Sequence, residues 1–353
     1  MSAPRDEASE VRAEDSFDTA AVHAWLRSVV DDLDAEPVVR QFPGGASNLT
    51  YLLTYPDREL ILRRPPVGKK AASAHDMRRE YRVQKGLKPV YPYVPTVLGL
   101  CQDESVLGSD FYVMERIEGT ILRNNLPEGM ELGAEQAREL STALVDRLVD
   151  LHRVDPEAAG LTDLGKGSGY VARQVGGWSK RYTAARTENV PDFAAVMDWL
   201  AAHQPDDVAT VVIHNDWRFD NVVLDDSLDV VGVLDWEMST LGDPLMDLGG
   251  AVAYWIQADD DAVYQQARRQ PTHLPGMLTR AELVDHYCAR MGLGTANWAF
   301  YEAFGLFRLA VIMQQIYYRF HHGQTTNPRF KDFWMFVGYL EWRCREVIGG
   351  AQA

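Results

Sequence analysis

The strongest structural signal in this chain of 353 residues is the stretch Val211-Val-Ile-His-Asn-Asp-Trp-Arg-Phe-Asp-Asn-Val-Val-Leu224, followed by Val230-Val-Gly-Val-Leu-Asp-Trp-Glu237. A β-branched run leads into a polar loop, and two further apolar runs flank a polar turn at residues 225–229, which predicts a β-hairpin. With the turn centred near residue 228, antiparallel pairing places Asn221 opposite Asp235, and Asp216 lies one loop away. We therefore expect two carboxylates and one amide oxygen to converge on a small volume.

These three side chains suit the transfer of a phosphoryl group. Asn221 and Asp235 carry hard oxygen ligands of the kind that Mg²⁺ takes when it also binds substrate phosphates. Asp216 is left to accept a proton from a hydroxyl group. An HxDxxxxN loop followed by a hairpin and an Asp is the layout of the protein-kinase catalytic centre. The alternative is an ordinary hairpin with acidic turns, which does not require all three residues at these spacings.

The variant of this layout points to a family. His214-Asn-Asp-Trp-Arg-Phe-Asp-Asn221 with Leu234-Asp-Trp-Glu237 resembles the aminoglycoside phosphotransferase and choline kinase branch of the kinase-like superfamily, in particular the kinase-like domain fused to some acyl-CoA dehydrogenases. The resemblance runs from about residue 41 to residue 319. It implies ATP and Mg²⁺ as cofactors, a small-molecule hydroxyl as acceptor, Asp216 as catalytic base and His214 as a support of the loop. Arg218 would either stabilise the transferring phosphate or pair with a neighbouring acid.

Bulk properties exclude several other classes of protein. The formal net charge of −16 argues against nucleic acid as a partner, because phosphate contacts need a basic face. No apolar run reaches the roughly 18–20 residues that span a bilayer, so no membrane partner is expected. Residues 1–15 are polar and acidic, lack the features of a secretory signal, and are expected to be a disordered lead-in. Three distant cysteines, Cys101, Cys288 and Cys344, fit a reducing cytoplasm. Nothing in the sequence indicates the oligomeric state.

The patterns together predict an α+β fold with two lobes, like that of the protein kinases. Residues 16–114 would form a small N-lobe with a nucleotide loop, a five-strand antiparallel sheet and one helix over residues 71–87. A further amphipathic helix over residues 16–33 would pack on its outside. Residues 115–119 would link the lobes. Residues 120–353 would form a larger, mainly helical C-lobe that carries the catalytic loop and the acceptor site.

The segment 38–55 is predicted to be two strands joined by a glycine-rich nucleotide loop. In such a loop, backbone N–H groups donate hydrogen bonds to a triphosphate. Glycine pairs in hairpins are also common as simple turns, and that alternative stays open. The residues of the loop that we expect to contact the nucleotide are Gly44, Gly45, Ser47, Asn48 and Thr50.

A cation at the end of the strand 59–63 is the expected phosphate contact. Kinases carry a Lys near this position, whereas this chain carries Arg63, which binds phosphate and is always charged. In a kinase fold the helix over residues 71–87 supplies a carboxylate for this cation, and Glu80 is the candidate. The alternatives are a solvated basic pair for Arg63 and local pairing with Arg79 or Arg82 for Glu80.

Strands at 94–100 and 111–117 lead into the link between the lobes. By the same resemblance, backbone groups around Glu115 and Ile117 would bind the adenine edge. Met114 would line the adenine pocket, or else be ordinary core.

The rest of the chain reads as helices, at residues 134–153, 169–187, 192–203, 281–291, 298–320 and 330–347. Asp243 followed by Pro244 is a good helix start, and Asp243 and Asp247 are candidates to brace the catalytic loop. For Asp243, helix capping alone is an equal alternative. The side chains proposed for the acceptor site are Glu237, Trp178, Tyr182, Gln314 and Tyr317.

The expected function is ATP- and Mg²⁺-dependent phosphorylation of a small alcohol, with a hydroxyacyl-type acceptor favoured. One alternative is an antibiotic kinase of the aminoglycoside type, whose acceptor pocket would be ringed by acids. Another is a nucleotide-binding module without catalysis, for which the missing Lys is the main argument.

Overall fold

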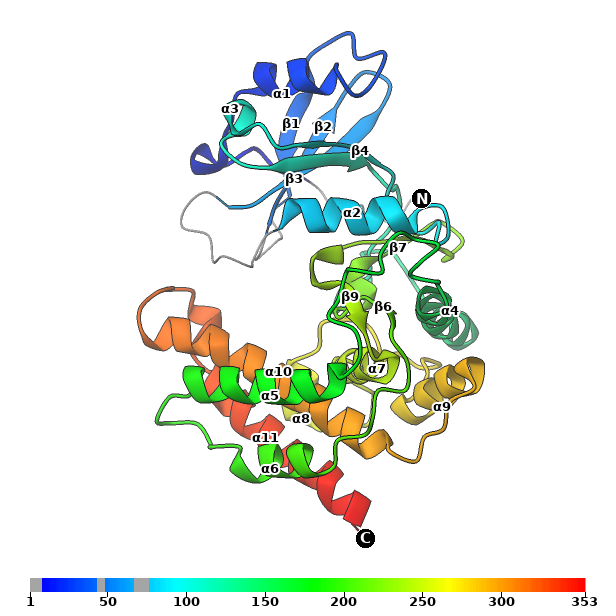
Figure 1. The fold of residues 1–353 in the computed structure, drawn as a ribbon, viewed down its shortest axis with the longest axis vertical. Helices are drawn as coiled ribbons and strands as arrows, with labels where there is room; N and C mark the ends of the chain where they lie inside the picture. Colours follow the sequence, from blue (N-terminus) through cyan, green and yellow to red (C-terminus); the bar gives the residue numbers. More distant parts are fainter. Residues whose placement is uncertain (1–7, 43–47, 67–75, 353) are drawn as a thin grey trace.

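A five-stranded antiparallel sheet in the order β1-β2-β3-β5-β4 forms the centre of the N-lobe, as predicted. The computed structural model describes residues 8–42, 48–66 and 76–352. In Figure 1 this sheet lies at one end of the molecule and the helical C-lobe at the other. The strands are β1 (Val38–Gln41), β2 (Leu49–Thr54), β3 (Glu59–Arg64), β4 (Val97–Cys101) and β5 (Phe111–Glu115).

Alternating side chains give the sheet two buried faces. One face packs against helix α1 (Thr19–Leu26) through residues such as Leu53, Leu62 and Val113. The other face, with Leu52, Ile61 and Tyr112, packs against helix α2 (Met77–Leu87). Figure 1 shows the sheet between these two helices, with α2 on the side of the C-lobe. This places Glu80, the carboxylate of α2, next to the boundary between the lobes.

The expectation of a disordered lead-in is wrong for residues 8–15, because they pack on the sheet. Ser9 exchanges backbone hydrogen bonds with Gln41, and the side chain of Gln41 donates to Asp15 (2.9 Å). Arg64 donates to the carbonyl of Asp15 (2.5 Å) while its guanidinium lies 5.3 Å from the ring centre of Tyr51. The first seven residues lie outside the described part of the chain. The polar and acidic composition of this segment suggested disorder. Its contacts are with residues distant in sequence, so no local pattern indicated them.

Two expected helices are shorter than predicted, and one was missed. The helix expected over residues 16–33 ends at Leu26, and beyond it Asp32 has a left-handed φ of 60°. The helix expected over residues 71–87 begins at Met77, after Asp76 accepts a hydrogen bond from the N–H of Arg79, and residues 71–75 lie outside the described part of the chain. A short helix α3 (Glu104–Leu107) occupies the loop predicted between β4 and β5.

The C-lobe is mainly helical, as expected, and its longer helices begin and end close to the predicted positions. Helix α8 and strand β9 were not predicted, because both are only a few residues long. No helix in the described ranges combines the length and apolarity needed to cross a membrane. The helices are α4 (Ala134–His152), α5 (Tyr170–Ala185), α6 (Ala194–Ala202), α7 (Pro244–Val252), α8 (Ala262–Gln266), α9 (Arg280–Met291), α10 (Trp298–His321) and α11 (Phe333–Gln352).

Two small antiparallel pairs of strands contain residues 211–237, the stretch that is expected to be catalytic. Strand β6 (Val211–Ile213) pairs with β9 (Thr240–Gly242), and β7 (Val222–Leu224) pairs with β8 (Val230–Val233) as the predicted hairpin. The predicted register is wrong by one residue, since the backbone N–H of Leu234 donates to the carbonyl of Asn221 (2.8 Å). The outer pairs, Val222 with Val233 and Val223 with Gly232, centre the hairpin between Ser227 and Leu228 rather than on Leu228. Asp235 therefore lies one residue beyond Asn221 rather than opposite it.

Helix α2 is attached to the C-lobe as well as to the sheet. Arg79 donates to the carbonyls of Leu164 (2.8 Å) and Ser239 (2.9 Å), and its own position is set by the cap at Asp76. Both acceptors belong to C-lobe segments. The helix that carries Glu80 is thus fixed relative to the catalytic stretch.

Helices α7 and α10 cross at close range through glycines. A Cβ atom added to Gly305 would overlap the backbone of Gly249, and one added to Gly249 would overlap the backbone of Tyr301. Helix α7 follows directly after the catalytic hairpin and carries Asp247. The close crossing therefore sets the distance between the hairpin and the long buried helix α10.

We predict that Gly305→Ala lowers the free energy of unfolding by about 1–3 kcal/mol, because the added methyl group overpacks the crossing. Gly338→Ala on α11 is the matched control, because a Cβ there meets no atom within 4 Å. Removing a helix-interior glycine at an open site is expected to be neutral or slightly stabilising. Differential scanning calorimetry of both variants checks this, and equal midpoints for the two would contradict the close crossing.

Candidate active site

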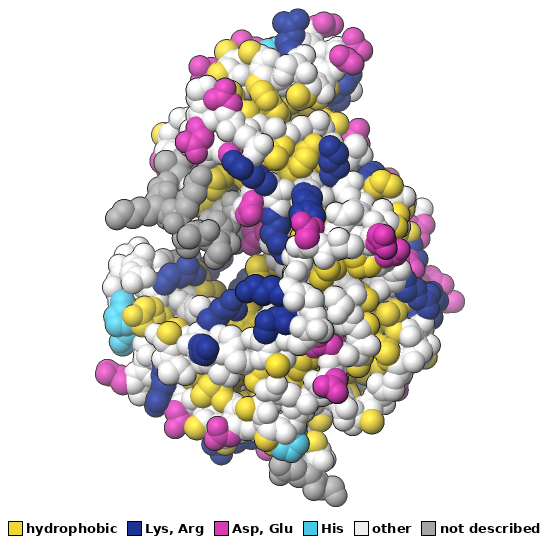
Figure 2. Space-filling view, in the orientation of Figure 1, with side chains coloured by type: hydrophobic (Ala, Val, Ile, Leu, Met, Phe, Trp, Pro, Cys, Tyr) yellow, Lys and Arg dark blue, Asp and Glu magenta, His cyan; other side chains and the backbone are white. Residues whose placement is uncertain are grey.

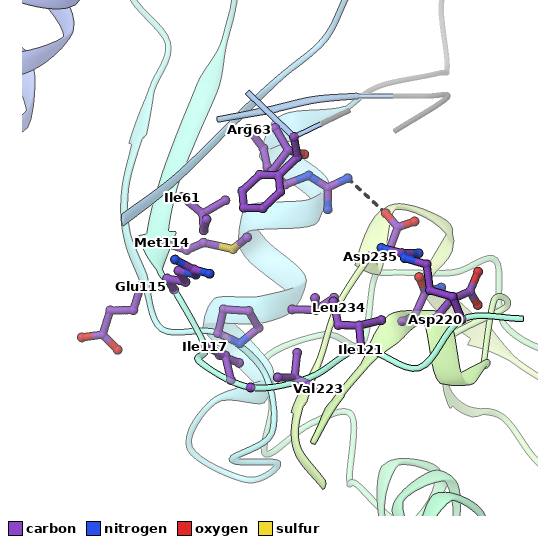
Figure 3. Close-up of a pocket in the computed structure, with 17 residues that line it drawn as sticks. Ile61, Arg63, Met114, Glu115, Ile117, Ile121, Asp220, Val223, Leu234 and Asp235 are labelled. Atoms are coloured by element: carbon purple, nitrogen blue, oxygen red, sulfur yellow. Dashed lines mark hydrogen bonds and ion pairs between the residues drawn. The ribbon is translucent and has the colours of Figure 1, made fainter. Parts of the chain in front are cut away.

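A cavity of about 600 Å³ lies between the two lobes. One part of its wall is apolar and includes Ile61, Met114 and Leu234, and another is charged and includes Arg63 and Asp235 (Figure 3). The apolar part comes from the sheet, the link between the lobes and the hairpin, and the charged part from the ends of β3 and β8. The predicted nucleotide and metal residues on its wall are Thr50, Arg63, Met114, Glu115, Ile117, Asn221 and Asp235.

The predicted nucleotide loop is only partly described. Gly44, Gly45 and Ser47 lie outside the described residues. Thr50 lies on the cavity wall, and the side chain of Asn48 donates to the carboxylate of Glu237 across the lobe boundary (2.9 Å). Glu237, expected in the acceptor site, therefore contacts the nucleotide-loop side of the cleft.

Arg63 joins two carboxylates that belong to different lobes. Its Nη1 donates to Glu80 (2.5 Å) and its Nη2 to Asp235 (3.0 Å), and Figure 3 shows the guanidinium directed at Asp235. Burial alone would lower the pKa of Arg63, but the carboxylates of Glu80 and Asp235 outweigh it and raise the pKa well above its ordinary value. The side chain stays charged. The structure thus brings together the pair of Arg63 and Glu80 that the sequence suggested, and adds the contact to Asp235.

The catalytic loop orients the carboxylate of Asp216. Its Oδ2 accepts hydrogen bonds from Arg218 Nη2 (2.8 Å) and from the amide of Asn221 (3.0 Å). The same amide nitrogen also donates to the backbone carbonyl of Asp216 (2.8 Å). Because both bonds use the nitrogen of Asn221, only its oxygen is left to face a cation. The side chain of Asp216 is 24% exposed, and the donors described here gather on one of its two oxygens.

Buried groups brace this loop from behind. Asp247 accepts hydrogen bonds from the backbone N–H groups of His214 and Asn215 (both 2.8 Å). His152 Nε2 lies 3.1 Å from the same carboxylate. Burial would raise the pKa of Asp247, but the hydrogen bond and charge of His152 and the contacts with His214 hold it below its ordinary value. The carboxylate of Asp247 is thus held by His152 as well as by the loop that it braces.

His214 and Asp243 occupy supporting positions too. The His214 ring lies between the N–H of Asp216, which donates to Nδ1 (3.2 Å), and the carbonyl of Leu234, to which Nε2 donates (2.9 Å). This links the catalytic loop to the metal motif. Asp243 caps α7 through Leu245 and Met246 and also accepts from the N–H of Val208 (2.7 Å). The predicted cap is present, whereas the bond to Val208 reaches the segment before β6 and not the catalytic loop.

Two backbone positions in the site have a left-handed conformation. Asn215 has φ 67° and Asp235 has φ 64°. Asn and Asp tolerate this region better than other non-glycine residues, but it still costs energy and tends to occur at functional sites. The turn at Asp235 moves its carboxylate out of the β8 direction, beside Arg63.

The prediction of the acceptor site is wrong for Tyr182 and Gln314, because both side chains are fully buried in the core. Tyr182 packs against Phe193 and donates to a backbone carbonyl, and Gln314 donates to the carbonyl of Ala185 (2.8 Å). Trp178 and Tyr317 are each 6% exposed. Tyr317 accepts from Asn189, whereas Trp178 lies beneath two guanidinium groups, those of Arg181 (4.5 Å) and Arg308 (5.5 Å).

Side chains from separate segments gather beside Asp216, and Tyr254 among them was not predicted from the sequence. Arg308 donates to the carbonyl of Asn215 (2.6 Å), and the guanidinium of Arg218 lies 4.8 Å from the ring centre of Tyr254. Burial raises the pKa of Tyr254, while the positive charges of Arg218, Arg308 and Arg269 oppose that shift. In Figure 2, Lys and Arg side chains gather on the helical lobe where it borders the hollow between the lobes. No local pattern joins these residues, since they come from separate segments.

Asp220 is a further residue of the cavity that was not predicted from the sequence, although it lies within the HxDxxxxN loop. It lies between Arg218 and Asn221, and it lines the cavity together with Arg123. Burial raises the pKa of Asp220, and the charges of Arg218 and Arg123 act against this rise. Among the described residues, no cluster of three or more His, Cys, Asp or Glu side chains is arranged to hold a metal.

Comparisons with known proteins agree with this geometry. The profile described as the phosphotransferase enzyme family matches residues 38–283. Acyl-CoA dehydrogenase family member 10 of Mus musculus is 37% identical over 311 residues, which are 87% of this chain and 29% of that protein. Acyl-CoA dehydrogenase family member 11 of Homo sapiens is 32% identical over 342 residues, 94% of this chain and 43% of that protein. The chain therefore spans less than half the length of these relatives.

Solved structures show the same fold. A structure from Ralstonia eutropha, described provisionally as an aminoglycoside phosphotransferase, has a TM-score of 0.80 and 32% identity over 94% of this chain and 98% of that one. Choline kinase from Cryptosporidium parvum has a TM-score of 0.67 and 11% identity over 95% of this chain and 98% of that one, a likeness of fold alone. The two-lobed, kinase-like fold predicted from the sequence is confirmed. Because the family profile covers most of the chain, this chain belongs to the phosphotransferase enzyme family.

Proposed function

We propose that this chain transfers the γ-phosphoryl group of ATP, with Mg²⁺, to a hydroxyl group of a small molecule. The observation that carries the proposal is the meeting of Arg63, Asn221 and Asp235 on the wall of one cavity, with Asp216 held beside Asn221. Phosphoryl transfer needs mainly positioning and charge stabilisation, and these residue types supply both.

The cavity suits a nucleotide in one orientation. The apolar end, with Ile61, Met114 and Leu234, fits an adenine ring, and residues of the link between the lobes line the same cavity. The phosphates would then extend towards Arg63. A structure of the same fold, the aminoglycoside phosphotransferase APH(4)-Ia, was solved as a ternary complex with AMP-PNP and hygromycin B; it has a TM-score of 0.57 and 13% identity. That complex is consistent with ATP as the phosphoryl donor here.

Asn221 and Asp235 fit a site for Mg²⁺. Both offer oxygen atoms, and Mg²⁺ is commonly held by one or two such groups together with substrate phosphates and water. The amide nitrogen of Asn221 is engaged by Asp216, so its oxygen is the atom that would face the ion. The side chain of Asp235 is 34% exposed, and one of its oxygens is bound to Arg63. When bound, the ion would offset the negative charge on the phosphate oxygens.

Asp216 is the group placed to accept the proton of the acceptor hydroxyl. Arg218 and Asn221 both donate to its Oδ2, which orients the carboxylate and leaves Oδ1 as the oxygen that would receive the proton. His214 holds the backbone N–H of this residue, so the carboxylate has little freedom to rotate away. The chain thereby orients the acceptor and receives its proton.

The acceptor is proposed to be a hydroxyacyl-type compound or another hydroxyl compound that carries an anionic group. Arg308 donates to the carbonyl of Asn215 in the loop, and its guanidinium and that of Arg181 both lie on the indole ring of Trp178. Arginine on an aromatic platform binds carboxylate or phosphate groups well. An aminoglycoside is a polycation and would require acids at this place. The cytoplasmic location stays a prediction, as does the absence of nucleic-acid and membrane partners.

We predict that Asp216→Asn lowers the turnover number by at least about 10²–10³-fold, because an amide cannot accept the proton. Binding of AMP-PNP in the presence of Mg²⁺ is expected to remain within a few-fold of wild type. Asp235→Ala is expected to weaken that binding instead. Release of ADP and isothermal titration calorimetry measure the two effects.

Asp226→Asn in the exposed hairpin turn is the matched control and should change neither quantity. Full turnover of Asp216→Asn would contradict the assignment of the base, and unchanged binding of AMP-PNP with Mg²⁺ in Asp235→Ala would contradict the metal site.

We predict that the acceptor preference follows charge. In a panel of hydroxyacyl compounds, hydroxy acids, neutral polyols and aminoglycosides, the anionic hydroxyl compounds should give the highest kcat/KM. Arg181→Glu should raise KM for them by about 10-fold or more, since one charge-assisted contact is lost and a repulsion is added. The control Arg345→Glu on α11 should have no effect, because that residue is on an exposed helix face. Efficient phosphorylation of an aminoglycoside, unaffected by Arg181→Glu, would overturn the proposed acceptor class.

A further inference from the structure

We infer that Asp220 is a positioning residue that holds Arg218 against Asp216 and so orients the carboxylate that accepts the hydroxyl proton. The inference rests on the proposed function and adds to it a second acid, which acts through the arginine. The geometry that points to this role is a line of three charged side chains, in which Arg218 stands between Asp216 and Asp220.

The two ends of the arginine head group contact different acids. Nη2 of Arg218 lies 2.8 Å from Asp216 Oδ2, and Nε lies 3.2 Å from Asp220 Oδ1. The first contact is a hydrogen bond, whereas the second is an ion pair whose two atoms have no hydrogen-bond partner among the described residues, so Asp220 holds the Nε end of the guanidinium by charge attraction. Tyr254 limits the third direction, because its ring lies beneath the guanidinium with 4.8 Å between Cζ and the ring centre. Arg218 therefore has one well-defined orientation.

Asp220 itself is anchored by the backbone around it. It is the middle residue of a short 3₁₀ turn, Phe219–Asn221. Phe219 is fully buried, its N–H donates to Gln270 (2.9 Å), and its ring packs against Trp255. On the other side, Asn221 is bound to Asp216. A carboxylate on such a turn is fixed before any substrate arrives, which is the property required of a group that orients another.

Solvent is largely excluded from this line of charges. The side chains of Arg218 and Asp220 are each 17% exposed, so their attraction is screened less than that of a surface pair. Removing Asp220 would leave Arg218 with Asp216 as its remaining acid and with freedom to move. The carboxylate of Asp216 would then lose the fixed plane that Arg218 gives it. We expect the removal of Asp220 to lower the rate of the chemical step and not the affinity for the nucleotide.

Two other roles for Asp220 are possible in principle, because it lines the nucleotide cavity. It would contact the metal or the nucleotide directly, or it would serve only the stability of the turn. Each role has its own signature. A direct contact raises KM for Mg·ATP or changes the metal dependence, and a purely structural role lowers the unfolding midpoint without a specific loss in kcat.

The test is a double-mutant cycle on kcat with Asp220→Asn, Arg218→Gln and the double variant, in the full chain with a saturating acceptor. Asp220→Asn alone should lower kcat about 10- to 100-fold, as expected for a small displacement of a catalytic group, with KM for Mg·ATP within about 2-fold of wild type. In the Arg218→Gln background the same change should lower kcat by less than about 2-fold. Asp226→Asn is the control and should leave kcat unchanged.

Full additivity of the two changes, or a raised KM for Mg·ATP with kcat intact, would overturn the inference. So would a loss of kcat in Asp220→Asn that is matched by a lowered thermal midpoint and is not partly restored by Asp220→Glu.

A second readout does not depend on turnover. The ¹⁵Nε signal of Arg218, assigned by its loss in Arg218→Lys, should report an ordered side chain in wild type and a mobile one in Asp220→Asn. An equally ordered signal in both would overturn the inference. If wild type turns over no acceptor while this signal behaves as expected, the proposed function fails and the positioning by Asp220 stands.

Discussion

The structure depends on one buried cation, the guanidinium of Arg63, that joins carboxylates from both lobes. Glu80 comes from the helix beneath the N-lobe sheet and Asp235 from the turn after the C-lobe hairpin, and both bind the same side chain. The side chain of Glu80 is 1% exposed, and a buried carboxylate of this kind would be costly without the arginine as its partner. The three groups therefore fix the relative position of the sheet, helix α2 and the metal motif. The cavity for the nucleotide is the space that this arrangement leaves open.

The other half of the site is fixed by hydrogen bonds that reach it from within the C-lobe. Asp247 holds the backbone of His214 and Asn215, while His214 links Asp216 to Leu234. These contacts hold the left-handed conformation at Asn215, which would otherwise be unfavourable. Catalysis of phosphoryl transfer relies on groups that are in place before the reaction. The buried contacts on this side and the ion pairs on the other give the cleft that preorganisation.

The sequence was sufficient for the parts of the site that lie close together in the chain. The order His214, Asp216, Asn221 and Asp235 identified the catalytic loop and the hairpin, and helical periodicity located most of the C-lobe helices. The strand register was wrong by one residue, because the pattern of apolar residues does not fix the centre of the turn to within half a residue. The sequence did not predict that residues 8–15 pack on the sheet, because Asp15 contacts Gln41 and Arg64, which are distant from it in sequence.

The acceptor side was the least predictable part. Tyr182 and Gln314 have side chains that suit a binding site, yet the packing of α5 and α10 buries both. Arg308 and Tyr254 lie next to the catalytic loop only because the chain returns to it after long intervals. Composition was misleading here as well, since a chain with a net charge of −16 has arginines beside its catalytic acid. Local charge at a site follows from the fold and not from the total.

The most direct test of this account is a crystal structure of the chain with Mg²⁺ and AMP-PNP. We expect the adenine ring beside Met114, a metal ion about 2.0–2.1 Å from oxygens of Asn221 and Asp235, and the γ-phosphate facing Asp216. A nucleotide bound outside the cleft between the lobes, or a metal ion held by neither Asn221 nor Asp235, would contradict it.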